Sequence, residues 1–208
     1  MPLAIAIPLF DGVTALDAVG PYEVLSRLPG ADVRFLAEEP GNVVTETGSM
    51  TMVAESALAD MPAPDLIVVP GGAGTRAAGR EPLVEWLRVA AQTARVTASV
   101  CTGALLLGKA DLLRGRRATT HWLFLERLRE YGAEPVSERV VDEGDLITAA
   151  GVSAGIDMAL GLAAREAGDE VAQAIQLGIE YDPQPPFDAG SPAKAPAAVV
   201  ELVRRRGA

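Results

Sequence analysis

The only cysteine of the chain, Cys101, stands between a short β-branched run and a run of small, helix-favouring residues. Residues 96–100 predict a buried strand, and residues 102–113 predict the helix that follows it. A thiol in the first turn of a helix meets unpaired backbone N–H groups and the positive end of the helix dipole, which favour the thiolate. The position therefore predicts a nucleophile. It fits a core-filling cysteine equally well, because free cysteine is among the most buried residue types.

Residues 151–155 match the G-x-S-x-G pattern of a hydrolase nucleophile, with Ser153 at its centre between a predicted strand and a helix. A hydrolase of that kind needs an acid and then a histidine after the serine, but the only histidine, His121, precedes Ser153. We therefore interpret Ser153 as a helix N-cap. His121, beside Trp122, is interpreted as a hydrogen-bonded structural residue outside the catalytic set.

Residues 72–77 fit the loose G-x-G-x-x-G/A dinucleotide pattern after a predicted strand. The acid expected about 20 residues further on is missing, because the next predicted strand ends at Cys101. We interpret Gly71 and Gly72 as a loop whose backbone N–H groups approach an anionic group at the carboxyl edge of the sheet, although a plain turn fits them as well. One Cys and one His cannot supply the usual nitrogen and sulfur ligands, so no metal is expected.

Strand-like and helix-like segments alternate along the chain, which predicts an α/β sandwich with helices on both faces of the sheet. The predicted strands are residues 3–9, 32–37, 65–69 and 96–100, with a hairpin over 43–54 and two short strands within 139–149. The predicted helices are residues 16–28, 83–94, 102–113, 121–131, 153–166, 169–181 and 196–206. The Pro-rich residues 182–187 cannot be helical.

Composition limits the class of protein. A chain of 208 residues, 49% hydrophobic and 22% charged, fits one globular domain over residues 1–208. A net charge of −10 argues against a nucleic-acid surface. The apolar residues 1–9 are too short for a signal or membrane helix, and one cysteine excludes an intrachain disulfide, so we expect a cytoplasmic protein without a membrane partner.

Three blocks resemble the ThiJ/PfpI superfamily: residues 70–72, residues 99–104 around Cys101, and residues 116–122. Within it, residues 17–25, 155–157 and 180–187 are similar to the isonitrile hydratases. The resemblance implies a flavodoxin-like three-layer sandwich with a mostly parallel sheet, the class I glutamine amidotransferase-like fold. The same blocks occur in sensor domains of AraC-type regulators, which continue into a helix-turn-helix domain. We expect no such domain here because the chain ends at Ala208.

The resemblance implies that Cys101 is the nucleophile and that Asp17 is the acid beside its sulfur. Thr102 stands where protease-like relatives carry a histidine, so a peptidase mechanism loses its base. The implied reaction hydrates an isonitrile to an N-substituted formamide through a cysteine thioimidate, with no cofactor. Thr102, with its hydroxyl and backbone N–H, and the N–H of Gly72 are expected to orient substrate or water and stabilise developing charge.

Three alternatives stay open at this point. One is glyoxalase or deglycase chemistry on small aldehydes. Another is an oxidative stress sensor in which a low-pKa Cys101 is oxidised. The third is a stand-alone ligand-sensing domain related to the AraC-type regulators. Superfamily members are commonly homodimers, and residues 182–192 are expected to form a strap across a partner.

Overall fold

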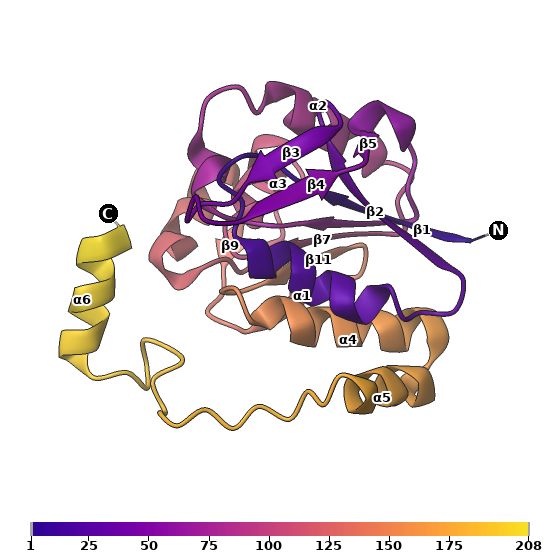
Figure 1. Cartoon of the computed structure of the whole chain (residues 1–208). Helices are drawn as coiled ribbons and strands as arrows, with labels where there is room; N and C mark the ends of the chain where they lie inside the picture. The colour runs from indigo at the N-terminus through magenta and orange to yellow at the C-terminus, as the bar shows by residue number, and fades with distance from the viewer. Residues whose placement is uncertain (1, 208) are drawn as a thin grey trace.

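Seven strands form the central sheet of the protein, whose computed structural model describes residues 2–207 (Figure 1). Their order is β10-β11-β7-β6-β1-β2-β5, and every neighbouring pair is parallel except β10 with β11. The strands are β1 (Leu3–Pro8), β2 (Ala31–Ala37), β5 (Ser56–Ala57), β6 (Leu66–Val69), β7 (Val96–Val100), β10 (Val140–Asp142) and β11 (Leu146–Ala149). This mostly parallel sheet confirms the predicted fold class.

The two central strands, β6 and β7, explain why the sheet must be covered on both sides. Every residue of both strands is buried, so neither strand has a face that meets water. Near-continuous apolar strands of this kind belong to parallel sheets with helices on both faces. Burial of β7 also fixes the position of the residue that follows it, Cys101.

Helices cover both faces of the sheet (Figure 1). On one face, α1 (Ala15–Leu25) packs against α4 (Ala154–Ala167), and α5 (Asp169–Gly178) packs on α4. On the other face lie α2 (Glu81–Ala90) and α3 (Gly103–Lys109). Glycines allow α1 and α4 to approach closely, since a Cβ on Gly155 would lie 3.2 Å from Pro21 Cγ.

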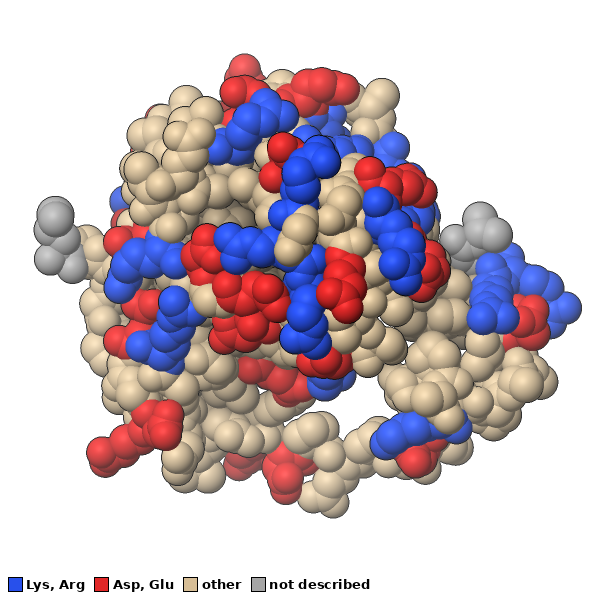
Figure 2. All heavy atoms as spheres, turned by 180° about the vertical axis from the view of Figure 1, so that it is seen from behind, with Lys and Arg blue, Asp and Glu red and all other residues tan. Residues whose placement is uncertain are grey.

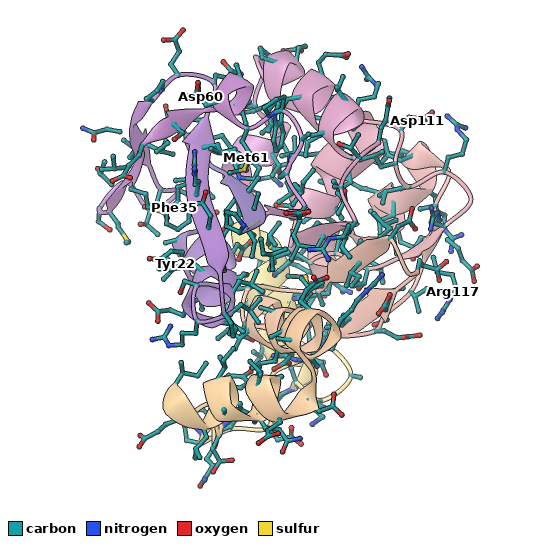
Figure 3. The ribbon with its side chains drawn as sticks, turned by 90° about the vertical axis from the view of Figure 1, so that its right-hand side faces the viewer. Tyr22, Phe35, Asp60, Met61, Asp111 and Arg117 are labelled. Atoms are coloured by element: carbon teal, nitrogen blue, oxygen red, sulfur yellow. The ribbon has the colours of Figure 1, made fainter. Side chains whose placement is uncertain are left out.

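Two side-chain contacts join α1 and α2 to segments near β2. The rings of Tyr22 on α1 and Phe35 on β2 lie with centroids 5.1 Å apart, and Figure 3 shows them adjacent. Trp86 of α2 donates its indole N–H to the carbonyl of Met61 at 3.2 Å. These contacts fix α1 and α2 relative to the sheet, and α1 carries Asp17.

The structure refines several predicted elements. The predicted hairpin is confirmed as β3 (Gly41–Val44) paired with β4 (Thr51–Ala54). The segment expected as an α-helix over 121–131 is a 3-10 helix, η3 (Trp122–Tyr131), because side chains three residues apart share a face in both helix types and sequence periodicity does not separate them. Sequence reasoning missed five short elements, which are β5, η1 (Leu58–Asp60), η2 (Ala73–Arg76), β8 (Arg117–Ala118) and β9 (Glu134–Pro135).

The C-terminal arm, residues 182–207, leaves the body of the molecule after α5. It runs as extended chain past α4 to α6 (Ala197–Gly207), which stands beside the body (Figure 1). Arg204 of α6 lies over the ring of Trp122 at 5.9 Å from its centroid. The arm leaves large apolar side chains exposed, with Phe187 77% and Leu202 44% accessible.

Charges of both signs are interspersed on the face seen in Figure 2. The Arg-rich loop that follows α3 illustrates this pattern, since Arg116 pairs with Asp145 at 2.8 Å and Arg117 with Glu138 at 2.7 Å. These two arginines therefore form ion pairs within the chain. No helix in the described part of the chain has the length and apolar character to cross a bilayer.

A matched pair of Gly→Ala substitutions tests how tightly α3 is seated on the sheet. A Cβ on Gly103 would lie 2.2 Å from the Val69 carbonyl oxygen, whereas a Cβ on the exposed Gly161 of α4 meets nothing within 4 Å. We expect Gly103→Ala to lower the free energy of unfolding by about 1–3 kcal/mol and Gly161→Ala to raise it by about 0.5–1 kcal/mol. Urea denaturation measures both. A Gly103→Ala protein as stable as the wild type contradicts the close seating.

Candidate active site

Cys101 occupies a sharp turn between β7 and α3. Its φ of 56° lies in the left-handed region that a side chain with a Cβ seldom adopts. Neighbouring segments hold this conformation, because the Cys101 N–H donates to the carbonyl of Ala150 at 2.7 Å and the Cys101 carbonyl accepts from the Thr120 hydroxyl at 2.6 Å. The turn therefore presents the sulfur at the carboxyl edge of the sheet, where open α/β folds place their sites.

Two glycines let the loop after β6 approach Cys101. A Cβ on Gly71 would lie 2.5 Å from the Thr102 nitrogen and 2.9 Å from Asp17 Oδ2. Gly72 has a φ of 127°, and a Cβ there would lie 2.3 Å from the Gly12 carbonyl oxygen. The loop makes a close backbone approach, as its sequence predicts. The Gly71 N–H donates to the Asp17 carboxyl, whereas the Gly72 N–H donates to the neutral hydroxyl of Thr102.

Asp17 lies in the first turn of α1 with none of its surface exposed. Its Oδ2 accepts a hydrogen bond from the Gly71 N–H at 2.9 Å, and its carboxyl interacts with the Cys101 thiol. Oδ1 is buried and accepts no hydrogen bond from the described residues. Burial raises the pKa of Asp17 from 3.8 to about 7, against the lowering effect of the Gly71 and Cys101 interactions. Asp17 can therefore hold or release a proton near neutral pH.

The thiol of Cys101 responds to the same burial. Burial and the charge of Asp17 raise the pKa of Cys101 to about 12, although the backbone N–H groups of Thr102 and Val152 favour the thiolate. The expectation that the helix terminus makes a free thiolate is therefore wrong for the resting site. The thiol is therefore protonated at rest, and Asp17, which titrates near neutrality, is the group placed to accept its proton.

Thr102 and Gly72 are brought together as the sequence predicts, but they bond to each other. The Gly72 N–H donates to Thr102 Oγ1 at 2.9 Å, and the Thr102 hydroxyl donates to the Gly72 carbonyl at 3.1 Å. Both residues are buried. In this structure the two groups thus fix the loop after β6 onto the start of α3, while the Thr102 backbone N–H faces the sulfur.

A cavity of about 310 Å³ opens over the sulfur. Its walls include Cys101, Thr102, Gly72 and His121. Sequence reasoning missed six further members, which are Thr14, Glu46, Ala73, Arg76, Phe124 and Val152. Glu46 comes from the loop between β3 and β4, so no local pattern in the sequence connects it with Cys101. Within residues 2–207, no group of three or more His, Cys, Asp or Glu side chains gathers to hold a metal ion.

His121 lines both the Cys101 cavity and a second cavity. Burial lowers the pKa of His121, and its Nδ1 accepts a hydrogen bond from the Leu123 N–H at 3.4 Å as the N-cap of η3. The second cavity, of about 420 Å³, is lined on one side by His121 and Trp122 and on the other by Ser191 and Pro192 of the C-terminal arm. The N-cap hydrogen bond gives His121 a structural contact, and its place in the wall of the Cys101 cavity also puts it beside the candidate nucleophile.

Sequence comparison relates the whole chain to proteins of known name. A curated isonitrile hydratase of Pseudomonas putida is 46% identical over 209 aligned residues, which cover 100% of this chain and 91% of that protein. The HTH-type transcriptional regulator CdhR of Pseudomonas aeruginosa is 31% identical over 84% of this chain, but the match covers 52% of the regulator.

Structure comparison gives the same relationship. A ThiJ/PfpI family protein from Pseudomonas syringae superposes with a TM-score of 0.93 and 33% identity, covering 99% of this chain and 86% of that one. The DJ-1/PfpI family model matches residues 4–165, which include Asp17, Gly72, Cys101 and Thr102. The chain therefore belongs to the DJ-1/PfpI family.

Proposed function

We propose that this protein is an isonitrile hydratase, a hydro-lyase that converts an isonitrile and water to an N-substituted formamide within one domain. The observation that carries the proposal is the burial of the Asp17 carboxyl beside the buried Cys101 thiol, in a chain that is similar over its whole length to an isonitrile hydratase. The reaction consumes only water, so this chain's own side chains can supply the proton transfers without a cofactor.

The first half of the reaction adds the thiol across the terminal carbon of the isonitrile. Asp17 takes the proton from Cys101 and delivers it to that carbon while the sulfur forms the S–C bond, which gives the thioimidate R–N=CH–S–Cys101. The raised pKa of Asp17 suits this relay, because a carboxyl that titrates near neutrality both accepts and donates a proton. The S–H bond of Cys101 breaks, and its sulfur and its hydrogen both become bonded to the same carbon.

The second half releases the product. The Asp17 carboxylate takes a proton from water as the water oxygen attacks the thioimidate carbon, and it passes that proton to the nitrogen. The hydroxyl of the resulting R–NH–CH(OH)–S–Cys101 then gives its proton to Asp17 as the intermediate collapses to R–NH–CHO, and Asp17 returns that proton to the departing sulfur. The backbone N–H groups of Thr102 and Val152 stabilise the departing thiolate. We assign Thr102 and Gly72 the role of holding together the loops that carry these donors. When the hydrogen bond from the Gly72 N–H to Thr102 Oγ1 opens, that N–H can stabilise developing charge.

The buried pair disfavours two of the alternatives. An oxidation sensor depends on a thiolate at neutral pH, whereas burial and Asp17 raise the pKa of Cys101. A binding domain without turnover gives no role to a carboxyl that lies buried against the thiol. Glyoxalase or deglycase chemistry also uses a nucleophilic thiol, so substrate tests must separate it from hydration.

Hydration of cyclohexyl isonitrile tests the proposal. We expect Cys101→Ala to abolish formamide production and Asp17→Asn to lower kcat by about 10²–10⁴-fold with the fold intact. The reacting pair holds one proton, so the wild-type rate should rise with pH through about 7, as Asp17 loses the second proton. Chromatography of the formamide measures the rate. Wild-type rates in Asp17→Asn, or consumption of glyoxal but not of the isonitrile by the wild type, contradict the proposal.

The role of Thr102 is tested by two substitutions of similar size. Thr102→Val removes the hydroxyl and leaves the buried Gly72 N–H without its acceptor, which costs about 1–3 kcal/mol of stability. We expect kcat to fall about tenfold or more in Thr102→Val, while Thr102→Ser keeps kcat near the wild-type value. Steady-state kinetics at a temperature where both variants are folded measures the effect. Equal kcat in the two variants contradicts the assignment.

We infer that the protein works as a homodimer in the cytoplasm, where a free catalytic thiol stays reduced. Exposed apolar side chains support self-association because a second copy can bury them. They lie on the hairpin (Val44, Met50 and Val53) and on the arm (Phe187 and Leu202).

Sedimentation velocity should give twice the chain mass for the wild type and a shift towards monomer for Phe187→Ser. A monomeric wild type contradicts the inference.

A further inference from the structure

The cavity over Cys101 has a wall that the hydration chemistry leaves unused. Its lining includes Cys101 and Thr102 of the reacting site. It also includes Phe124 of η3 and Arg76 of η2, which take no part in the hydration steps. A cavity of about 310 Å³ lies at the lower end of ligand pockets, so it admits a small isonitrile whose substituent extends from the sulfur towards this wall.

Arg76 is a cation at this wall without an internal partner. Its guanidinium lies over the Phe124 ring, 4.6 Å from the centroid. Its nitrogen atoms make no hydrogen bond or ion pair with any described residue. Arg80, four residues later, differs, because it donates to the carbonyls of Gly74 and Asp11. Stacking on Phe124 orients the Arg76 fork and leaves its N–H donors to a ligand.

Glu46 is the other charged group in this cavity, and each of its carboxylate oxygens accepts a hydrogen bond from within the chain. Oε1 accepts from the Thr14 hydroxyl at 2.7 Å, and Oε2 accepts from the Ala73 N–H at 3.1 Å. His121, which also lines the cavity, favours its neutral form because burial lowers its pKa. Among the described residues that line the cavity, Arg76 is therefore the one cation available to a substrate.

Resting on the proposed hydratase function, we propose that Arg76 selects isonitriles whose substituent carries a carboxylate. The guanidinium binds the carboxylate, and the isonitrile carbon at the other end of the molecule then reaches Cys101. A planar two-donor fork matches a carboxylate better than a point charge does, so the recognition depends on arginine rather than on positive charge alone. A local cation is needed because the chain carries a net charge of −10, which repels anionic substrates at long range.

The test compares 3-isocyanopropanoate with its uncharged amide, 3-isocyanopropanamide, as substrates of nearly equal size. We expect the wild type to hydrate the carboxylate with a kcat/KM about tenfold above that of the amide, mainly through a lower KM. Arg76→Gln should bring the ratio to about one or below and leave kcat/KM for the amide unchanged. Arg76→Lys should keep only part of the preference.

Arg88→Gln is the matched control, because Arg88 is an exposed arginine of α2 outside the Cys101 cavity, and its loss changes the net charge equally. It should retain the wild-type ratio. A wild-type ratio of one or less, a ratio that survives Arg76→Gln, or an equal loss in Arg88→Gln overturns the assignment of Arg76 while hydration of the amide leaves the proposed function standing. A wild type that hydrates neither compound, nor cyclohexyl isonitrile, overturns both.

Discussion

The burial of a carboxyl against a thiol is the interaction on which the rest of this molecule depends. Burial away from water raises the free energy of the charged forms of Asp17 and Cys101. The protonation of each group therefore depends on the protonation of the other. The pair is kept together by backbone donors from three loops, which come from Gly71, Thr102 and Val152. The carboxyl edge of the parallel sheet is where these loops meet.

The backbone around the pair accepts strain and close contacts that few sequences tolerate. Cys101 keeps a left-handed φ because the β11–α4 loop and Thr120 bond its peptide groups. Gly71 and Gly72 admit contacts that a Cβ would block. The free-energy cost of this backbone strain is offset by the burial of the apolar strands β6 and β7. Their close packing also makes the edge of the sheet rigid. A rigid edge holds the sulfur, the carboxyl and the donors at fixed distances, which proton relay requires.

Much of this arrangement was predictable from the sequence, and the failures have physical reasons. The apolar runs before Cys101 predicted β6 and β7, and the strand-to-helix change placed the thiol at the turn. The role of Asp17 came from resemblance, since an acid in the first turn of a helix is common and points to no site by itself. The expectation of a thiolate was wrong because the helix terminus is not the largest influence on the pKa of Cys101. The burial of the thiol and the charge of Asp17 raise that pKa more than the backbone N–H groups lower it.

The walls of the cavity were the least predictable part. Glu46 and Phe124 come from the β3–β4 loop and η3, and only tertiary packing brings them to the sulfur. No periodicity or spacing connects residues in such loops, so a single sequence carries no signal for them. Arg76 lies close to Gly72 in the sequence, but its importance rests on its stacking over Phe124 and on its free donors, which are properties of the folded chain.

The most direct test of the shared proton is the pH dependence of Cys101 alkylation by iodoacetamide in the wild type and in Asp17→Asn. Removal of the carboxylate charge should lower the pKa of the thiol, so the midpoint of alkylation should move to lower pH in Asp17→Asn, with Cys101→Ala as the unlabelled control. A midpoint that is unchanged or higher in Asp17→Asn would contradict the coupling of Asp17 to Cys101 on which the account rests.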